Sequence, residues 1–95
     1  MSAYIVVNAT VTDPALLDEY VAAAGQTLRG HEVKVHVANN EATVLEGDAG
    51  ERIVVLEFPS RDAALAWYKS PEYQAVIGKR LNSTKGFLTL VDGIG

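Results

Sequence analysis

The side chains that could do chemistry are few. The chain has two histidines and no cysteine, which excludes a thiolate nucleophile, a disulfide framework and a cysteine-ligated metal. His31 and His36 fit neither the H-x-x-x-H nor the H-E-x-x-H spacing of helical zinc sites. We therefore expect no metal site and no cofactor. His36 alternates with Glu32 and Lys34, which is typical of a solvated edge residue, and a ligand or acid–base role is the alternative.

Two polar residues interrupt otherwise apolar segments. Glu57 lies in segment 52–58, where an unpaired carboxylate would be costly. It needs either a Lys or Arg partner at the rim of a sheet or surroundings that raise its pKa for general-base chemistry. Asn8 lies among the valines of segment 4–11. If it is buried it must find hydrogen bonds, and this makes it a candidate pocket residue.

Aromatic residues gather in the second half of the chain. Trp67, Tyr68 and Tyr73 recur at helical spacing, and such a group more often packs in a core than binds a ligand. There is no G-x-S-x-G motif, no G-x-G-x-x-G motif and no phosphate-binding glycine loop. No catalytic residue is therefore assigned from a motif.

The elements that must position these residues follow from the hydrophobic pattern. Segment 4–11 is almost entirely apolar, as in a central strand buried on both faces. Asp13 and Pro14 predict the start of a helix, which Gly30 ends. Segment 32–37 alternates polar and apolar residues and predicts an edge strand, followed by a short returning strand over 42–46. Segment 52–58 predicts a second central strand.

Two further helices and a last strand complete the order. Ser60 caps a short helix that runs through Lys69, and Ser70 with Pro71 starts a third helix over residues 71–81. Gly86 opens a last strand over 87–92. The order β-α-β-β-α-β with a split second helix predicts an α+β, ferredoxin-like fold with an antiparallel sheet, as one domain over residues 1–95.

Both faces of the predicted sheet are apolar. Helices in this architecture cover one face only. On the first strand, Ile5 and Val7 lie on one face and Tyr4 and Val6 on the other, so neither face is polar. The simplest cover for the open face is the same face of a second copy, which closes two sheets into a dimeric α/β barrel. A monomer with exposed valines is the alternative.

Composition sets further limits. Eight Lys and Arg against twelve Asp and Glu give a net charge of -4, without the positive charge that nucleic-acid binding requires. No apolar stretch approaches the roughly 18 residues of a membrane span, and the N-terminus lacks the features of a signal peptide. We expect a cytoplasmic protein that binds neither nucleic acid nor a membrane.

Three segments resemble one bacterial family. The family known as domain of unknown function 1330 has similar sequences at Val44–Asp48, Arg52–Ser60 and Trp67–Tyr73. The similarity covers nearly the whole chain. The segment 30–37 departs from the pattern, since family members more often carry glycine or basic residues there. The resemblance implies membership of the dimeric α/β-barrel superfamily, in which ferredoxin-like protomers pair through their sheets.

Relatives in that superfamily include cofactor-free monooxygenases, haem-degrading oxygenases and lactone isomerases, so membership does not choose a reaction. The haem-degrading branch uses an Asn on the first strand, a Trp on the penultimate helix and a His ten positions later. Asn8 and Trp67 resemble the first two, but Ile77 stands at the third, so haem is not expected. The resemblance also implies that Asn8 faces the helices. Polarity alone would place Ile5 and Val7 there, and we follow the resemblance.

The leading hypothesis is a small homodimer that binds an apolar or aromatic small molecule between sheet and helices. Its cleft is expected to be walled by Tyr4, Asn8, Trp67 and Tyr73, with His36 and Glu57 as further candidates for ligand binding. A cofactor-independent monooxygenase or isomerase is one alternative, and a non-catalytic assembly module is the other. Whether the protein is an enzyme stays open.

Overall fold

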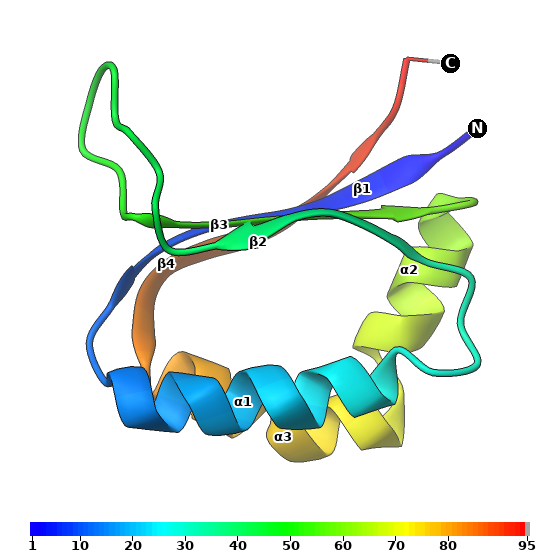
Figure 1. Cartoon of the computed structure of the whole chain (residues 1–95). Helices are drawn as coiled ribbons and strands as arrows, with labels where there is room; N and C mark the ends of the chain where they lie inside the picture. The colour runs from blue at the N-terminus through cyan, green and yellow to red at the C-terminus, as the bar shows by residue number, and fades with distance from the viewer. Residues whose placement is uncertain (95) are drawn as a thin grey trace.

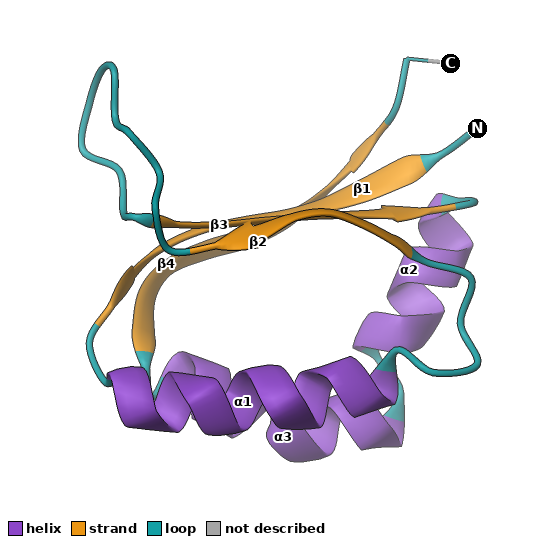
Figure 2. Cartoon of the chain, in the orientation of Figure 1, coloured by secondary structure: helices purple, strands orange, loops and turns teal. Residues whose placement is uncertain are grey.

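The computed structural model of the chain, which describes residues 1–94, has two layers: a four-stranded antiparallel sheet, and helices on one of its faces (Figure 1 and Figure 2). The elements in chain order are β1 (Ala3–Val11), α1 (Pro14–Thr27), β2 (Lys34–Asn39), β3 (Arg52–Phe58), α2 (Arg61–Tyr68), α3 (Pro71–Leu81) and β4 (Thr84–Asp92). The strand order across the sheet is β2-β3-β1-β4. This arrangement confirms the predicted α+β, ferredoxin-like class, including the split second helix.

Each helix begins at the side-chain cap that the sequence predicts. The side chains of Asp13, Ser60 and Ser70 accept backbone N–H groups of the first turn at 3.1, 3.1 and 3.2 Å. Pro14 and Pro71 follow two of these caps, where the missing N–H costs no intrahelical bond. These local signals therefore fix where the helices start.

Two predictions about strands are wrong. Residues 42–46 form no strand, because residues 40–51 make a loop that rises from the sheet on the side away from the helices (Figure 1). β4 begins at Thr84 rather than at residue 87, since Gly86 lies inside the ladder opposite Ala9. A Cβ on Gly86 would lie 2.1 Å from the carbonyl oxygen of Asn8, so this glycine allows two strands to approach closely.

The edge strand β2 contains a β-bulge. Val35 pairs with Leu56 and Val37 with Val55, so His36 is the extra residue. The bulge interrupts the alternation that the sequence predicts for this strand. As a result Val35 lies toward the helices, while Val37 lies on the other face of the sheet.

The core lies between the sheet and the helices. α1 and α3 lie side by side beneath the sheet, and α2 leads from the sheet down to them (Figure 2). Ile5, Val7 and Ala9 of β1 point into this core, against buried side chains such as Leu17 and Trp67. Within residues 1–94, no helix has both the length and the apolar character needed to span a membrane.

The other face of the sheet carries no helix. We call it the open face. The strand registers place on it Lys34, Val37 and Asn39 of β2, Tyr4, Val6, Asn8 and Thr10 of β1, Ile53, Val55 and Glu57 of β3, and Lys85, Phe87, Thr89 and Val91 of β4.

Candidate functional site

A cavity of about 150 Å³ lies between the sheet and the helices α1 and α3. Apolar side chains of three strands form most of its wall, among them Val7, Leu56 and Leu88. Trp67 of α2 and Tyr20 of α1 are the aromatic residues of the lining. A cavity of this size is large enough for a molecule the size of benzene.

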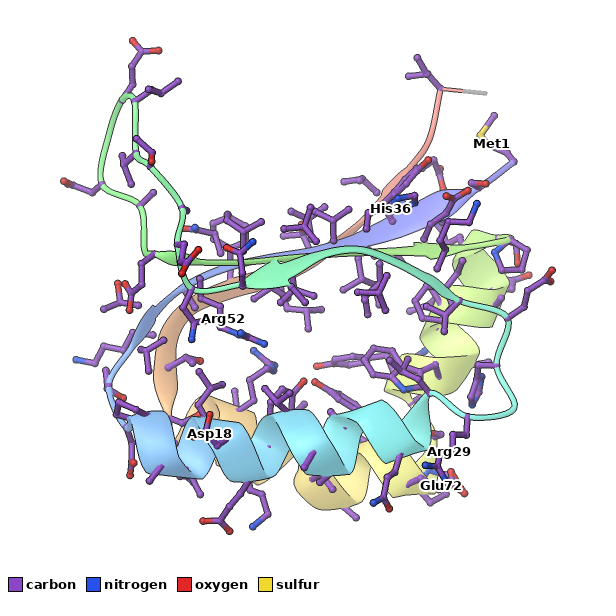
Figure 3. The ribbon with its side chains drawn as sticks, in the orientation of Figure 1. Met1, Asp18, Arg29, His36, Arg52 and Glu72 are labelled. Carbon is purple, nitrogen blue, oxygen red and sulfur yellow. The ribbon has the colours of Figure 1, made fainter. Side chains whose placement is uncertain are left out.

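Two arginines and a pair of tyrosines supply the polar groups beside this cavity. Arg52 is only 9% exposed, and its Nη1 donates to Asn40 Oδ1 at 2.9 Å. Figure 3 shows its side chain on the helix side of the sheet. Arg80 of α3 donates from Nε to the Tyr73 hydroxyl at 3.2 Å, and the hydroxyls of Tyr20 and Tyr73 lie 2.8 Å apart. Arg52, Arg80 and Tyr20 all line the cavity.

No carboxylate of residues 1–94 forms an ion pair with either arginine. The cavity lining contains neither Asp nor Glu, and the ion pairs found within residues 1–94 are His36–Glu57, Arg61–Asp92 and Lys79–Glu19. Burial lowers the pKa of the Arg52 guanidinium, which nevertheless stays protonated near neutral pH. Burial, and then the neighbouring Tyr73, raise the pKa of Tyr20 far above its usual range, so its hydroxyl stays neutral. The cavity thus combines apolar walls with two uncompensated positive charges.

The six predicted ligand-binding residues are not brought together. Trp67 and Tyr73 are fully buried beneath the sheet, where their rings lie 4.2 Å apart, as expected for core aromatics. Tyr4 and Asn8 lie on the open face, with Glu57 and His36 beside them. The predicted cleft is therefore wrong, because the sheet separates its walls. Asn8 and Trp67 share no pocket, so the likeness to the haem-degrading site does not extend to geometry.

Asn8 holds the loop 40–51 to the sheet. Its Nδ2 donates to the carbonyl oxygens of Gly50 at 3.0 Å and Arg52 at 3.3 Å, and its Oδ1 accepts the Gly50 N–H at 3.0 Å. The placement of Asn8 on the helix side, taken from the resemblance, is wrong. Polarity, which puts Ile5 and Val7 there, predicts the faces correctly. Asn8 is thus hydrogen-bonded by protein groups and positions a loop.

Glu57 belongs to a hydrogen-bonded group at the rim of the open face. Ser2 Oγ donates to Glu57 Oε2 at 2.7 Å, and His36 Nε2 lies 2.7 Å from Glu57 Oε1. The Ser2 hydroxyl first, and His36 second, lower the pKa of Glu57, so it is not a general base with a raised pKa. Lys34 lies opposite Glu57 in the ladder and also lowers its pKa, but the hydrogen-bond partners of Glu57 are Ser2 and His36. Within residues 1–94, no three acidic or histidine side chains are grouped so that they could hold a metal ion.

The arginines of the cavity were missed by the sequence reasoning, although a signal for them exists. Arg52 is an even number of residues from Leu56 and Phe58, and on a strand this parity places it on the same face as those core residues. Arg80 follows Tyr73 by two helical turns and therefore shares its face of α3. For both arginines, periodicity points inward.

Solved structures share this fold at low sequence identity. RPA0582, a protein of unknown function from Rhodopseudomonas palustris, is 14% identical with a TM-score of 0.78, over 99% of this chain and 83% of that chain. SnoaB, a cofactor-independent oxygenase from Streptomyces nogalater, is 11% identical with a TM-score of 0.70, over 99% and 94%. A dimeric ferredoxin-like protein of unknown function from Thermobifida fusca is 12% identical with a TM-score of 0.68, over 98% and 92%. These similarities show the fold alone.

Sequence comparison identifies the family. No curated protein sequence matches this chain. The profile of one family matches residues 2–94, which spans every helix and strand of the fold. The chain therefore belongs to the family described as Domain of unknown function (DUF1330), the same family that its sequence segments resemble.

Proposed function

We propose that the protein binds an apolar or aromatic small molecule in the cavity between its sheet and helices. The observation that carries the proposal is the cavity itself, about 150 Å³ with mainly apolar walls. Protein interiors are close-packed and leave few voids larger than a water molecule. This volume lies below the roughly 300–1,000 Å³ of sites for drug-sized ligands. The ligand is accordingly about the size of one substituted aromatic ring.

Trp67 provides the assay for binding. It is the only tryptophan of the chain, it lines the cavity, and its Nε1–H donates to Thr27 Oγ1 at 2.9 Å. Titration with benzamide and with sodium benzoate should change the Trp67 fluorescence and the indole N–H resonance in a saturable way. A response to neither probe would contradict the proposal and would favour the non-catalytic assembly module.

Two neighbouring valines supply a matched pair of variants. Val54 lines the cavity, whereas Val55 lies on the open face. Val54→Phe fills the cavity and should abolish the response of Trp67 to both probes. Val55→Phe adds the same side chain on the other side of the sheet and should leave ligand binding in place. Equal effects of the two substitutions would place the ligand elsewhere.

The second part of the proposal is a homodimer formed through the open face. Support comes from the apolar side chains on it: Phe87 and Val91 of the edge strand β4 are 52% and 46% exposed, and Val6 and Val55 lie on the two central strands beside them. Contiguous apolar patches of this kind are uncommon on monomeric soluble proteins. The similar protein from Thermobifida fusca is described as dimeric.

Segments that project on the open side add to this support. The loop 40–51 and the C-terminal segment after β4 both rise on that side of the sheet (Figure 1). Leu45 in the loop and Ile94 near the C-terminus are almost completely exposed. A second copy seated between these segments would cover their apolar side chains along with the sheet.

Light scattering tests the dimer. The wild type should have twice the mass of the 10.2 kDa chain, and Val55→Lys should be monomeric because it places a charge at the centre of the open face. Leu81→Lys is the control, since Leu81 is exposed at the end of α3 in the helix layer. A monomeric wild type would refute the dimer, as would a Val55→Lys variant with the wild-type mass.

A cofactor-independent monooxygenase is the second candidate, favoured by the neutral Tyr20 hydroxyl on the cavity wall. Oxygenation without a metal or flavin needs a substrate that forms its own stabilised carbanion, while the protein supplies orientation and a cavity poor in water. The Tyr20 hydroxyl would stabilise the negative charge of the carbanion. Oxygen uptake with a single-ring 1,3-diketone, lost in Tyr20→Phe, would favour this activity over binding alone.

A further inference from the structure

We infer that the ligand of this cavity is a small organic carboxylate whose apolar body packs in the cavity and whose negative charge is bound by Arg52 and Arg80. The inference rests on the proposed function, because it specifies the ligand class for the same cavity. Its basis is the juxtaposition of two guanidinium groups with an apolar lining that contains no acidic residue.

Arg52 lacks a counter-charge in a place where one is needed. It is 9% exposed, and its guanidinium donates to the neutral amide oxygen of Asn40 at 2.9 Å. Within residues 1–94, no Asp or Glu forms an ion pair with Arg52. Burying an unpaired charge is costly. A bound carboxylate would remove this cost, and its two oxygens match the planar fork of a guanidinium.

Arg80 is held in position for the same purpose. Its Nε donates to the Tyr73 hydroxyl, which in turn lies 2.8 Å from the Tyr20 hydroxyl. This bond fixes one edge of the guanidinium, and its two Nη atoms make no hydrogen bond to the described part of the chain. Because Arg80 lines the cavity, these Nη donors remain available to a ligand.

The polar and apolar parts of the lining are separated along the sheet. Arg52 opens β3, and Arg80 lies four residues before Thr84, the residue that opens β4, so the two cations and the Thr84 hydroxyl lie toward one end of the sheet. Leu56 lies four residues after Arg52 on β3, which separates their Cα atoms by roughly 13 Å. Trp67 lies beyond it, stacked on Phe58 at the far end of β3. This arrangement, with the charged residues at one end of the cavity and the apolar residues at the other, fits a ligand that has a charged head and an apolar body.

The cavity volume sets the size of the probe. About 150 Å³ accommodates a single aromatic ring with its carboxylate group, so sodium benzoate is a suitable anionic probe. Benzamide has nearly the same shape and no charge, and it therefore serves as the neutral control. Both are titrated into the full-length protein while Trp67 fluorescence and the heat of binding are recorded.

The expected result separates charge from shape. Benzoate should bind at least about tenfold more tightly than benzamide, as expected when a charge-assisted hydrogen bond is lost. Arg52→Met and Arg80→Met should each weaken benzoate binding by at least about tenfold and change benzamide binding by less than about twofold. Arg52→Lys should give an intermediate loss, because it keeps the charge but not the planar fork.

Arg29→Met is the matched control. Arg29 is exposed and lies beyond the end of α1, outside the cavity lining (Figure 3), so its removal should change neither affinity. Wild-type protein that binds benzamide as tightly as benzoate would overturn the carboxylate inference but leave ligand binding intact. Arg52 and Arg80 variants that fold and keep wild-type affinity for benzoate would likewise overturn it. Failure of both probes to bind would overturn the proposed function as well.

Discussion

Replacing Asn8 tests whether this residue of the open face has a structural role, holding the loop 40–51 to the sheet, and no role in the cavity. The Asn8 side chain makes three hydrogen bonds, two to Gly50 and one to Arg52, and these bonds tie the loop 40–51 to the start of β3. Asn8→Leu conserves the volume of the side chain and removes all three bonds. It leaves the Gly50 N–H and two carbonyl oxygens facing an apolar side chain.

The magnitude follows from these contacts. A typical intramolecular hydrogen bond contributes about 0.5–1.5 kcal/mol, and a buried group left without a partner costs about 1–3 kcal/mol. The Asn8 bonds are partly buried, so water will replace some of them. We therefore expect the free energy of unfolding to fall by about 2–3 kcal/mol, which corresponds to a drop of roughly 10–20 °C in Tm for a domain of this size.

Urea unfolding followed by Trp67 fluorescence measures this loss at one fixed protein concentration, since dimerisation would make stability depend on concentration. Thr10→Val is the control, because Thr10 is an exposed residue of the same strand, next along from Asn8 on its face. It should change the free energy of unfolding by less than about 0.5 kcal/mol. Benzoate affinity should be the same in Asn8→Leu as in the wild type. A loss below about 1 kcal/mol, or a selective loss of affinity in folded protein, would refute this role for Asn8.

Three more predictions concern the loop 40–51, helix α3 and the rim of the open face. Gly50→Ala should destabilise by about 3 kcal/mol or more, because its Cβ would lie 2.0 Å from a backbone oxygen of β1. Gly78 lies in α3, and a Cβ added there would have no atom within 4 Å, so Gly78→Ala should raise the free energy of unfolding by about 0.5–1 kcal/mol. Thermal melts that fail to separate the two variants would contradict both expectations. The pKa of Glu57 is lowered below its ordinary 4.5, so its stabilising contribution is full above that value and is lost as the pH falls through the folded pKa. Glu57→Gln should therefore flatten the dependence of stability on pH below about pH 5, and urea titrations giving parallel curves for the two proteins would count against it.

The parts of the fold that depend on near neighbours were predictable from the sequence. Helix starts at Asp13, Ser60 and Ser70 need only a capping side chain and the turn that follows it. The alternation of β1 likewise identifies its two faces, whereas the likeness of Asn8 and Trp67 to the haem-degrading site places Asn8 on the wrong one. The bulge at His36 has no such signal, because it depends on how β2 meets β3.

The cavity depends on relations that no local pattern contains. Arg52 and Arg80 lie far apart in the sequence and meet at one cavity because α3 packs beside α1 beneath the sheet. The space between the layers is set by the side chains that separate them, such as Tyr20 and Trp67. Periodicity can show that a residue points inward. It cannot show that the space there is left unfilled.

Because neighbouring residues of a strand point to opposite faces of the single sheet, each face of this protein can change independently during evolution. Odd-numbered residues of β1 and even-numbered residues of β3 face the helices, and several of them line the cavity, while their immediate neighbours face the open side. A codon change at Val54 therefore acts on one property of the protein, and a change at Val55 acts on another. Under the proposed function, ligand preference and self-association can therefore diverge along separate evolutionary paths, although both depend on alternating positions of the same two strands.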